Sequence, residues 1–220
     1  MDERGAYELI ARMGKALASP VRLRLLHLLC QGSRSVEALA EAAEEPVATV
    51  SHHLRKLDHA GLVTATRSGR FVSYAIASPE VRTLWLELKR LAADQLPELR
   101  TGVEALRRSR DECGRVSREE LLDLLDEGRI SLIDVRPEEE YHAGHLPGAV
   151  SIPADRVPEM LPALPRDRPV VAYCRGAYCR LADRAVIELG RAGFTAWRYE
   201  DGVVEWEAAG LGVERDGGSD

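Results

Sequence analysis

Two cysteines and two arginines lie close together in the second half of the chain. They belong to one run of seven residues: Cys174, Arg175, Gly176, Ala177, Tyr178, Cys179 and Arg180. This run follows an apolar, strand-like segment and precedes a helical pattern. At such a turn, backbone N–H groups and the start of the helix stabilise an anion, and the two arginines add positive charge. Because the thiolate is the nucleophilic form of cysteine, we expect a lowered pKa and reactivity for Cys174.

Cys179 comes five residues after Cys174, so the two sulfur atoms can meet on one loop. It could convert a persulfide on Cys174 into a disulfide or a bridged polysulfide. It could equally be a small residue that fills the first turn of the following helix. The spacing from Cys174 to Arg180 also fits cysteine phosphatases and some arsenate reductases, in which the arginine binds an oxyanion through two hydrogen bonds.

The segments around this loop predict an α/β domain. Short β-branched runs at residues 130–135 and 169–173 alternate with helical stretches, which is typical of a central parallel sheet. We place this domain at residues 117–215. Residues 101–116 are predicted to be a linker, because the sequence there becomes charged and loses its periodicity. Residues 216–220 are predicted to be a disordered tail.

Several motifs in this domain resemble the rhodanese family. They are Ile133-Asp134-Val135-Arg136, Gly144-His145-Leu146-Pro147-Gly148-Ala149, and the closing Asp201-Gly202 and Glu205-Trp206. The resemblance implies that Cys174 is the catalytic cysteine and accepts sulfane sulfur from a donor such as thiosulfate or a persulfide. It implies that amides from Arg175 to Cys179 hold the terminal sulfur, and that no cofactor is needed. Asp134, Arg136 and His145 are expected to support the structure.

The first half, residues 1–100, reads as a mainly helical domain. Helical patterns cover residues 7–30 in two parts, then residues 35–43 and residues 47–60, with a turn at 44–46. Residues 62–77 alternate as a β-hairpin with its turn at Ser68-Gly69, and a long helix follows from Pro79. Two helices joined by a tight turn and followed by a hairpin form a helix-turn-helix with a wing.

The second helix of such a pair lies in the major groove of DNA. Its polar side chains and the basic residues of the hairpin give the predicted DNA contacts: Thr49, Ser51, His52, Arg55, Lys56, Arg67 and Arg70. Val50, Leu54 and Leu57 fall on the opposite face, where packing residues belong. We therefore expect double-stranded operator DNA as a partner, with Arg67 and Arg70 on phosphate groups.

The first half closely resembles the ArsR family of winged-helix repressors, through residues 16–23, 50–54 and 60–63. The resemblance implies a homodimer that forms through residues 5–17 and 80–96. Metal-sensing members carry cysteine, histidine or acidic ligands on the third or the last helix. Here the third helix opens with Arg34-Ser35-Val36, and residues 79–100 contain neither histidine nor cysteine, so we predict no metal site. Cys30 and Cys113 are further candidate sensing thiols.

Composition limits the class of protein. Charged residues make up 30% of the 220 residues and hydrophobic residues 45%, as in ordinary globular domains. No apolar run approaches the ~20 residues of a membrane helix, so we expect a cytoplasmic protein that does not contact membrane. The formal charge is +2 for residues 1–100 and −8 for residues 101–220, so only the first half favours contact with nucleic acid.

Together these features predict a dimeric DNA-binding regulator, with repression the expected mode, whose second domain senses or processes reactive sulfur. One alternative is that the protein is primarily an enzyme, a thiosulfate or persulfide sulfurtransferase whose first domain serves for dimerisation. A second alternative is a phosphatase or arsenate reductase that uses Cys174 and Arg180. Thiosulfate-to-cyanide sulfur transfer without turnover of phosphate esters or arsenate would exclude it.

Overall fold

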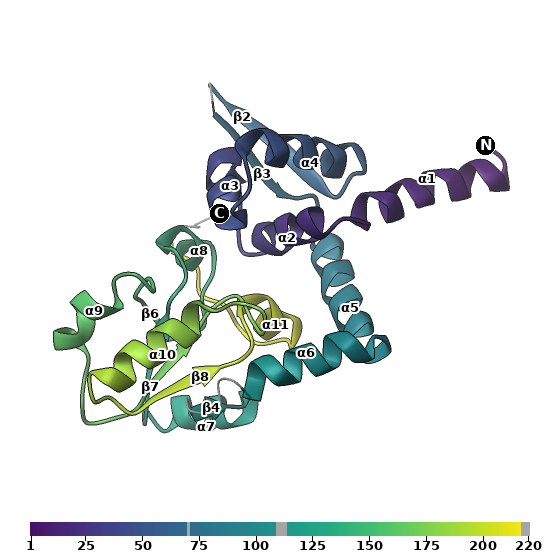
Figure 1. Cartoon of the computed structure of the whole chain (residues 1–220). Helices are drawn as coiled ribbons and strands as arrows, with labels where there is room; N and C mark the ends of the chain where they lie inside the picture. Colours follow the sequence, from purple (N-terminus) through teal and green to yellow (C-terminus); the bar gives the residue numbers. More distant parts are fainter. Residues whose placement is uncertain (70, 109–113, 217–220) are drawn as a thin grey trace. The chain divides into compact units, whose positions relative to one another are not determined.

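A computed structural model describes residues 1–69, 71–108 and 114–216 of the chain (Figure 1). The chain divides into two compact units, residues 1–89 and 90–220. Helix α5, Pro79–Gln95, begins in the first unit and ends in the second. The hairpin and helices of the first unit and the sheet of the second confirm the predicted two-part fold class.

The first unit is a helical domain with a small antiparallel sheet. Its elements before α5 are α1 (Glu3–Leu17), α2 (Pro20–Leu29), β1 (Arg34–Ser35), α3 (Val36–Ala43), α4 (Val47–His59), β2 (Val63–Ser68) and β3 (Phe71–Ile76). Their limits follow from local chemistry. Pro20 stands at the first position of α2, and the Ser35 hydroxyl accepts a hydrogen bond from the Ala38 amide at the start of α3. Ser68 pairs with Phe71 in the hairpin, and Gly69 has a φ of 60°.

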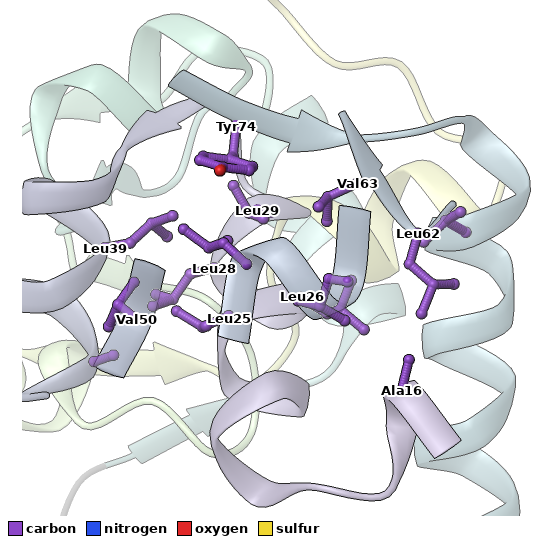
Figure 2. Packing of buried hydrophobic residues seen from close by; sticks show 14 of the residues in the cluster. Ala16, Leu25, Leu26, Leu28, Leu29, Leu39, Val50, Leu62, Val63 and Tyr74 are labelled. Carbon is purple, nitrogen blue, oxygen red and sulfur yellow. The ribbon is translucent and has the colours of Figure 1, made fainter. Parts of the chain in front are cut away.

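One hydrophobic core holds the first unit together. Figure 2 shows the leucines of α2 between Leu39 and Val50 on one side and Leu62 and Val63 on the other. Val50, Leu54 and Leu57 are fully buried. Because these α4 residues face the core, the opposite face of α4 is left for other contacts.

The second unit is built on a five-stranded parallel sheet. Its elements after α5 are α6 (Pro97–Arg108), β4 (Gly114–Val116), α7 (Arg118–Asp126), β5 (Ser131–Asp134), α8 (Glu138–Ala143), β6 (Val150–Ser151), α9 (Val157–Met160), the 3-10 helix η1 (Leu161–Ala163), β7 (Val170–Tyr173), α10 (Leu181–Arg191), β8 (Ala196–Tyr199) and α11 (Val203–Ala208). The strand order is β4-β8-β7-β5-β6, with every neighbouring pair parallel.

Both faces of this sheet are buried, each in its own apolar core. Val170, Ala172 and Cys174 pack with residues of α10, whereas Val171 and Tyr173 pack with residues of α7 and α11. This alternation follows from the two-residue period of a strand. Helix α10 lies alongside β7 and β8, as Figure 1 shows. Cys174 therefore leaves β7 on the face that α10 covers.

Regular elements lie within the predicted linker at residues 101–116. Helix α6 extends through Arg108, and Gly114–Val116 is an edge strand that pairs with β8. The side chain of Trp197 lies so close to Gly114 that an added Cβ would stand 2.2 Å from it. The short strand β4 forms because it pairs with β8, which is distant in the sequence. A local charge pattern does not reveal such a pairing. Of the predicted tail, only Asp216 lies within the described residues.

No helix in the described part of the chain is long and apolar enough to cross a membrane.

Candidate functional site

The loop after β7 brings Cys174 and Cys179 together, as its spacing predicted. Cys174 is 1% exposed, and Cys179 is half-buried at the start of α10. The side chains of Cys174 and Cys179 lie within hydrogen-bonding reach of each other. The Cys179 amide in turn donates to the carbonyl of Gly176 at 3.0 Å, which closes the turn.

The two thiols differ in acidity. Burial raises the pKa of Cys174 well above its ordinary value, and the hydrogen bond and charge of Cys179 raise it further. The Cys174 hydrogen bond lowers the pKa of Cys179 to about 6, with help from backbone N–H groups and the charge of Arg175. Because the two thiols interact, they titrate as a pair: the first proton is lost below the usual pH for a cysteine and the second well above it. The expected low pKa of Cys174 is not found, because burial outweighs the local positive groups.

The main-chain donors of the loop are divided between the two sulfur atoms. Cys174 accepts from the Ala182 amide in the first turn of α10. Cys179 accepts from the amides of Arg175 and Leu181. Amides and a helix start do stabilise an anion here, but on the second cysteine of the loop.

The two arginines of the loop point to different environments. Arg175 forms three hydrogen bonds of 2.5 to 2.9 Å with the carboxylate of Glu140, which is itself buried in α8. This contact fixes the first half of the loop against α8. Arg180 is exposed just before α10, so the structure gives it no role in holding the loop.

A third arginine, Arg198 on β8, lies beneath the loop and was missed from the sequence. It is 1% exposed and donates hydrogen bonds to the carbonyls of Gly176 and Cys179, each at 3.1 Å, and to the Asp183 carboxylate. Its positive charge also lowers the pKa of Cys174. An arginine among the apolar and aromatic residues of strand 196–199 was the available signal, because a buried arginine needs several acceptors.

Two glycines allow the backbone of the cysteine loop to pack closely against the segment that precedes α11. Gly176 has a φ of 99°, which side chains rarely adopt. A Cβ on Gly202 would stand 2.8 Å from the Cys174 carbonyl oxygen and 2.9 Å from the Gly176 nitrogen. The backbone that precedes α11 is therefore in direct contact with the cysteine loop.

The three residues expected to support the domain lie in buried or half-buried contacts. Arg136 and Asp134 are fully buried and pair at 2.6 Å, and Arg136 also donates to the Gly144 carbonyl at 2.6 Å. His145 stacks on Tyr141 with ring centroids 3.7 Å apart. These contacts fix the segments that follow β5 and α8, and they involve neither thiol.

In the first unit, the exposed face of α4 carries the predicted DNA contacts. His52, Arg55 and Lys56 are exposed, and Thr49 and Ser51 are half-buried. Arg67 is exposed on β2. Arg70 lies outside the described residues. The face thus presents basic groups and hydrogen-bonding groups together, which is the combination that reads DNA.

Cys30 and Cys113 were the other two candidate sensing thiols. Cys30 is 3% exposed at the end of α2, within the first unit. Cys113 lies outside the described residues. No group of three histidine, cysteine or acidic side chains suited to a metal ion is found within residues 1–69, 71–108 and 114–216.

Comparison with known proteins assigns both halves. Residues 19–65 match the family model of bacterial regulatory proteins of the arsR family, and residues 117–209 match the model of the rhodanese-like domain. The HTH-type transcriptional regulator Rv0324 of Mycobacterium tuberculosis is 42% identical over 205 residues, which cover 93% of this chain and 90% of that protein.

Two further similar proteins match the first half. A probable mercury resistance operon repressor of Streptomyces lividans is 37% identical over 40% of this chain and 71% of its own length. The homodimeric winged helix-turn-helix DNA-binding domain of a possible ArsR-family transcriptional regulator from Mycobacterium bovis was solved by NMR. It is 39% identical, covering 44% of this chain and 92% of that one, with a TM-score of 0.42.

The family matches and the similarity over nearly the whole length agree with the fold. The chain therefore belongs to the arsR family of bacterial regulatory proteins, as a transcriptional regulator that carries a rhodanese-like domain in its second half.

Proposed function

We propose that the protein is a homodimeric repressor whose affinity for operator DNA responds to sulfane sulfur received by the Cys174–Cys179 pair. The observation that carries this proposal is geometric: one buried loop, held by Arg198 and Arg175, brings two thiols together before α10. A sulfur-accepting loop on the same chain as a DNA-binding domain favours sensing over a purely metabolic role.

The first chemical step is transfer of one sulfur atom. The thiolate of Cys179 takes the proton of Cys174, and the Cys174 sulfur then attacks the sulfane sulfur of thiosulfate. A new S–S bond forms on Cys174, the S–S bond of thiosulfate breaks, and sulfite leaves with the electron pair. With a persulfide donor, the leaving group is the corresponding thiolate.

The second step uses Cys179 as a nucleophile. Cys179 passes its proton to the terminal sulfur of the Cys174 persulfide, its thiolate attacks the inner sulfur, and hydrosulfide leaves with the electron pair of the broken S–S bond. The cysteines are oxidised to a disulfide while the transferred sulfur atom is reduced, so no further oxidant is needed. Arg175, Arg198 and the Ala182 amide stay in place throughout and offset negative charge on the loop.

Dimer formation is supported by apolar side chains on the surface of one chain. Tyr7 and Ile10 on α1 are each 64% exposed, and Leu84 on α5 is 40% exposed. Large apolar groups this exposed favour burial against a second copy. They belong to residues 5–17 and 80–96, the segments expected to form the interface.

DNA binding with and without a sulfur donor tests the proposal. Wild-type protein should change its affinity for a duplex that it selects from a random-sequence pool when thiosulfate or polysulfide is added, whereas Cys174→Ser should not. Intact mass spectrometry should show sulfur addition in Cys179→Ser and its absence in Cys174→Ser. Sulfur addition to Cys174→Ser alone would assign the acceptor role to Cys179. An unchanged wild-type affinity despite sulfur loading would support the sulfurtransferase alternative.

A further inference from the structure

A cleft of about 500 Å³ in the first unit is lined almost entirely by basic residues. It lies among α1, α2 and α4. The cations that line it are Arg12 and Lys15 of α1, Arg22 of α2, and Arg55 and Lys56 of α4. His52 and His59 add two imidazoles, and none of the described residues that line the cleft is acidic. A concave surface of one charge sign concentrates its field and attracts ions of opposite charge.

Arg22 is a buried cation of this cleft. It is 8% exposed, and its guanidinium donates to the backbone carbonyls of Ala16 and Lys15, the latter at 2.9 Å. Its Nη1 also lies 3.4 Å from Nδ1 of His53. Among the described residues no carboxylate pairs with it. Removing a cation from water without a counter-ion is costly, so an anion in the cleft would offset this cost.

Arg22 also fixes the wall of the cleft. Its two carbonyl contacts hold the last turn of α1 against α2, and the His53 contact joins both to α4. Burial lowers the pKa of His53, and the charge of Arg22 lowers it further. The positions of Arg12 and Lys15 relative to α4 are therefore set by the fold. Both side chains are exposed toward solvent, free to meet a ligand.

We propose that this cleft binds backbone phosphates of the DNA duplex read by α4, with Arg12 and Lys15 as two phosphate contacts outside the helix-turn-helix. The inference rests on the proposed function, because His52, Arg55 and Lys56 belong both to the cleft and to the proposed reading face of α4. A duplex seated on α4 brings its phosphates to these side chains, and α1 supplies cations on the other side of the cleft. The proposed DNA interface thus includes α1, which is not part of the helix-turn-helix.

The salt dependence of DNA binding tests this inference on the full chain. The probes are a duplex selected by the wild-type protein from a random-sequence pool and a shuffled duplex of equal length. Each phosphate contact adds about 0.9 to the slope of log K against log salt. Arg12→Ala and Lys15→Ala should each weaken binding to both duplexes and reduce the slope by about 0.9 for each protomer in contact. Arg12→Lys should retain the wild-type slope.

Arg4→Ala is the matched control. It removes one positive charge from the same helix, at an exposed position that pairs with Glu8 and does not line the cleft. Its slope should equal that of wild type. If Arg12→Ala and Lys15→Ala behave like Arg4→Ala while wild type binds its selected duplex, the cleft inference is wrong and the proposed function stands. If wild type prefers no duplex over the shuffled one, the proposed function fails and this inference fails with it.

Discussion

Arg198 donates a hydrogen bond from Nη1 to the backbone carbonyl of Cys179 at 3.1 Å, so a buried strand residue holds the cysteine loop from below. Its Nη2 reaches the carbonyl of Gly176 at the same distance. In the parallel register Arg198 lies beside Ala172 of β7, two residues before Cys174. The planar guanidinium can therefore bind two carbonyls and Asp183 at once, which fixes the turn between the two thiols.

Replacing Arg198 should slow sulfur loading of the cysteine loop, although Arg198 is not itself one of the reacting groups. Arg198→Met removes the hydrogen bonds from Arg198 to the carbonyls of Cys179 and Gly176 and its ion pair with Asp183, and breaking a buried ion pair costs about 3–5 kcal/mol. Arg198→Lys keeps the charge but cannot bind both carbonyls at once. It should therefore fold, but it should load sulfur more slowly than wild type. Urea unfolding and single-turnover sulfur loading measure the two effects. Arg180→Met, at an exposed position, is the control and should match wild type in both.

A role in positioning predicts a change in acidity as well as in rate. Because the charge of Arg198 lowers the pKa of Cys174, Arg198→Met should move alkylation of that cysteine to higher pH. Wild-type acidity at Cys174 in a stable Arg198→Met protein would show that Arg198 serves the fold alone.

Cys179 should react as a thiolate well below the usual pH for cysteine. The thiolate is the nucleophilic form, and half of the thiol is ionised at its pKa, so a pKa of about 6 predicts that alkylation of Cys179 reaches half its maximal rate near that pH. Cys174→Ala removes the largest cause of this low pKa and should shift the profile to higher pH. Peptide mass spectrometry after iodoacetamide pulses at a series of pH values separates the two cysteines. An unshifted profile in Cys174→Ala would contradict the coupling between the two thiols.

Gly202 should tolerate no side chain. A Cβ there would stand 2.8 Å from the Cys174 carbonyl oxygen, so Gly202→Ala must displace the loop and should cost about 1–3 kcal/mol, as overpacking does. Sulfur loading should fall with it. Gly190→Ala is the matched control: it lies within α10, and apart from its chain neighbours and the backbone of its own helix no described atom lies within 4 Å of the added Cβ. It should keep sulfur loading and gain about 0.5–1 kcal/mol from helix propensity. Equal stability of the two variants would contradict the tight contact.

The sequence predicted most of the elements because their ends carry local signals. Pro20 and Ser35 mark the starts of α2 and α3, and the alternation around Ser68-Gly69 marks the hairpin. Helix α6 and strand β4 were missed for different reasons. Helix α6 has a charged sequence that reads as a linker, and the three residues of β4 depend on pairing with β8.

The site was predictable where chemistry is local in sequence. Cys174 and Cys179 were found because one loop contains both. Arg198 could not be placed beneath them, because that contact depends on the register of β7 and β8. The sequence also predicted the wrong direction for the pKa of Cys174. Its spacing does not show that Cys174 is buried beneath α10, and this burial raises the pKa. The basic cleft needs three helices to pack, so its residues share no sequence motif.

Substitutions on the exposed face of α4 should distinguish contacts with bases from attraction that depends on charge alone. Arg55→Ala and His52→Ala should each weaken binding to the selected duplex by about 1–3 kcal/mol and relax its sequence preference, as loss of a base contact does. Asp58→Asn is an informative control on the same helix, since it removes an exposed negative charge. It should leave preference unchanged and bind both selected and shuffled duplexes at least as tightly as wild type, because phosphate repulsion falls. Anisotropy titrations of both duplexes at fixed salt measure these effects. Equal losses on selected and shuffled duplexes for Arg55→Ala would move that residue from base reading to phosphate contact.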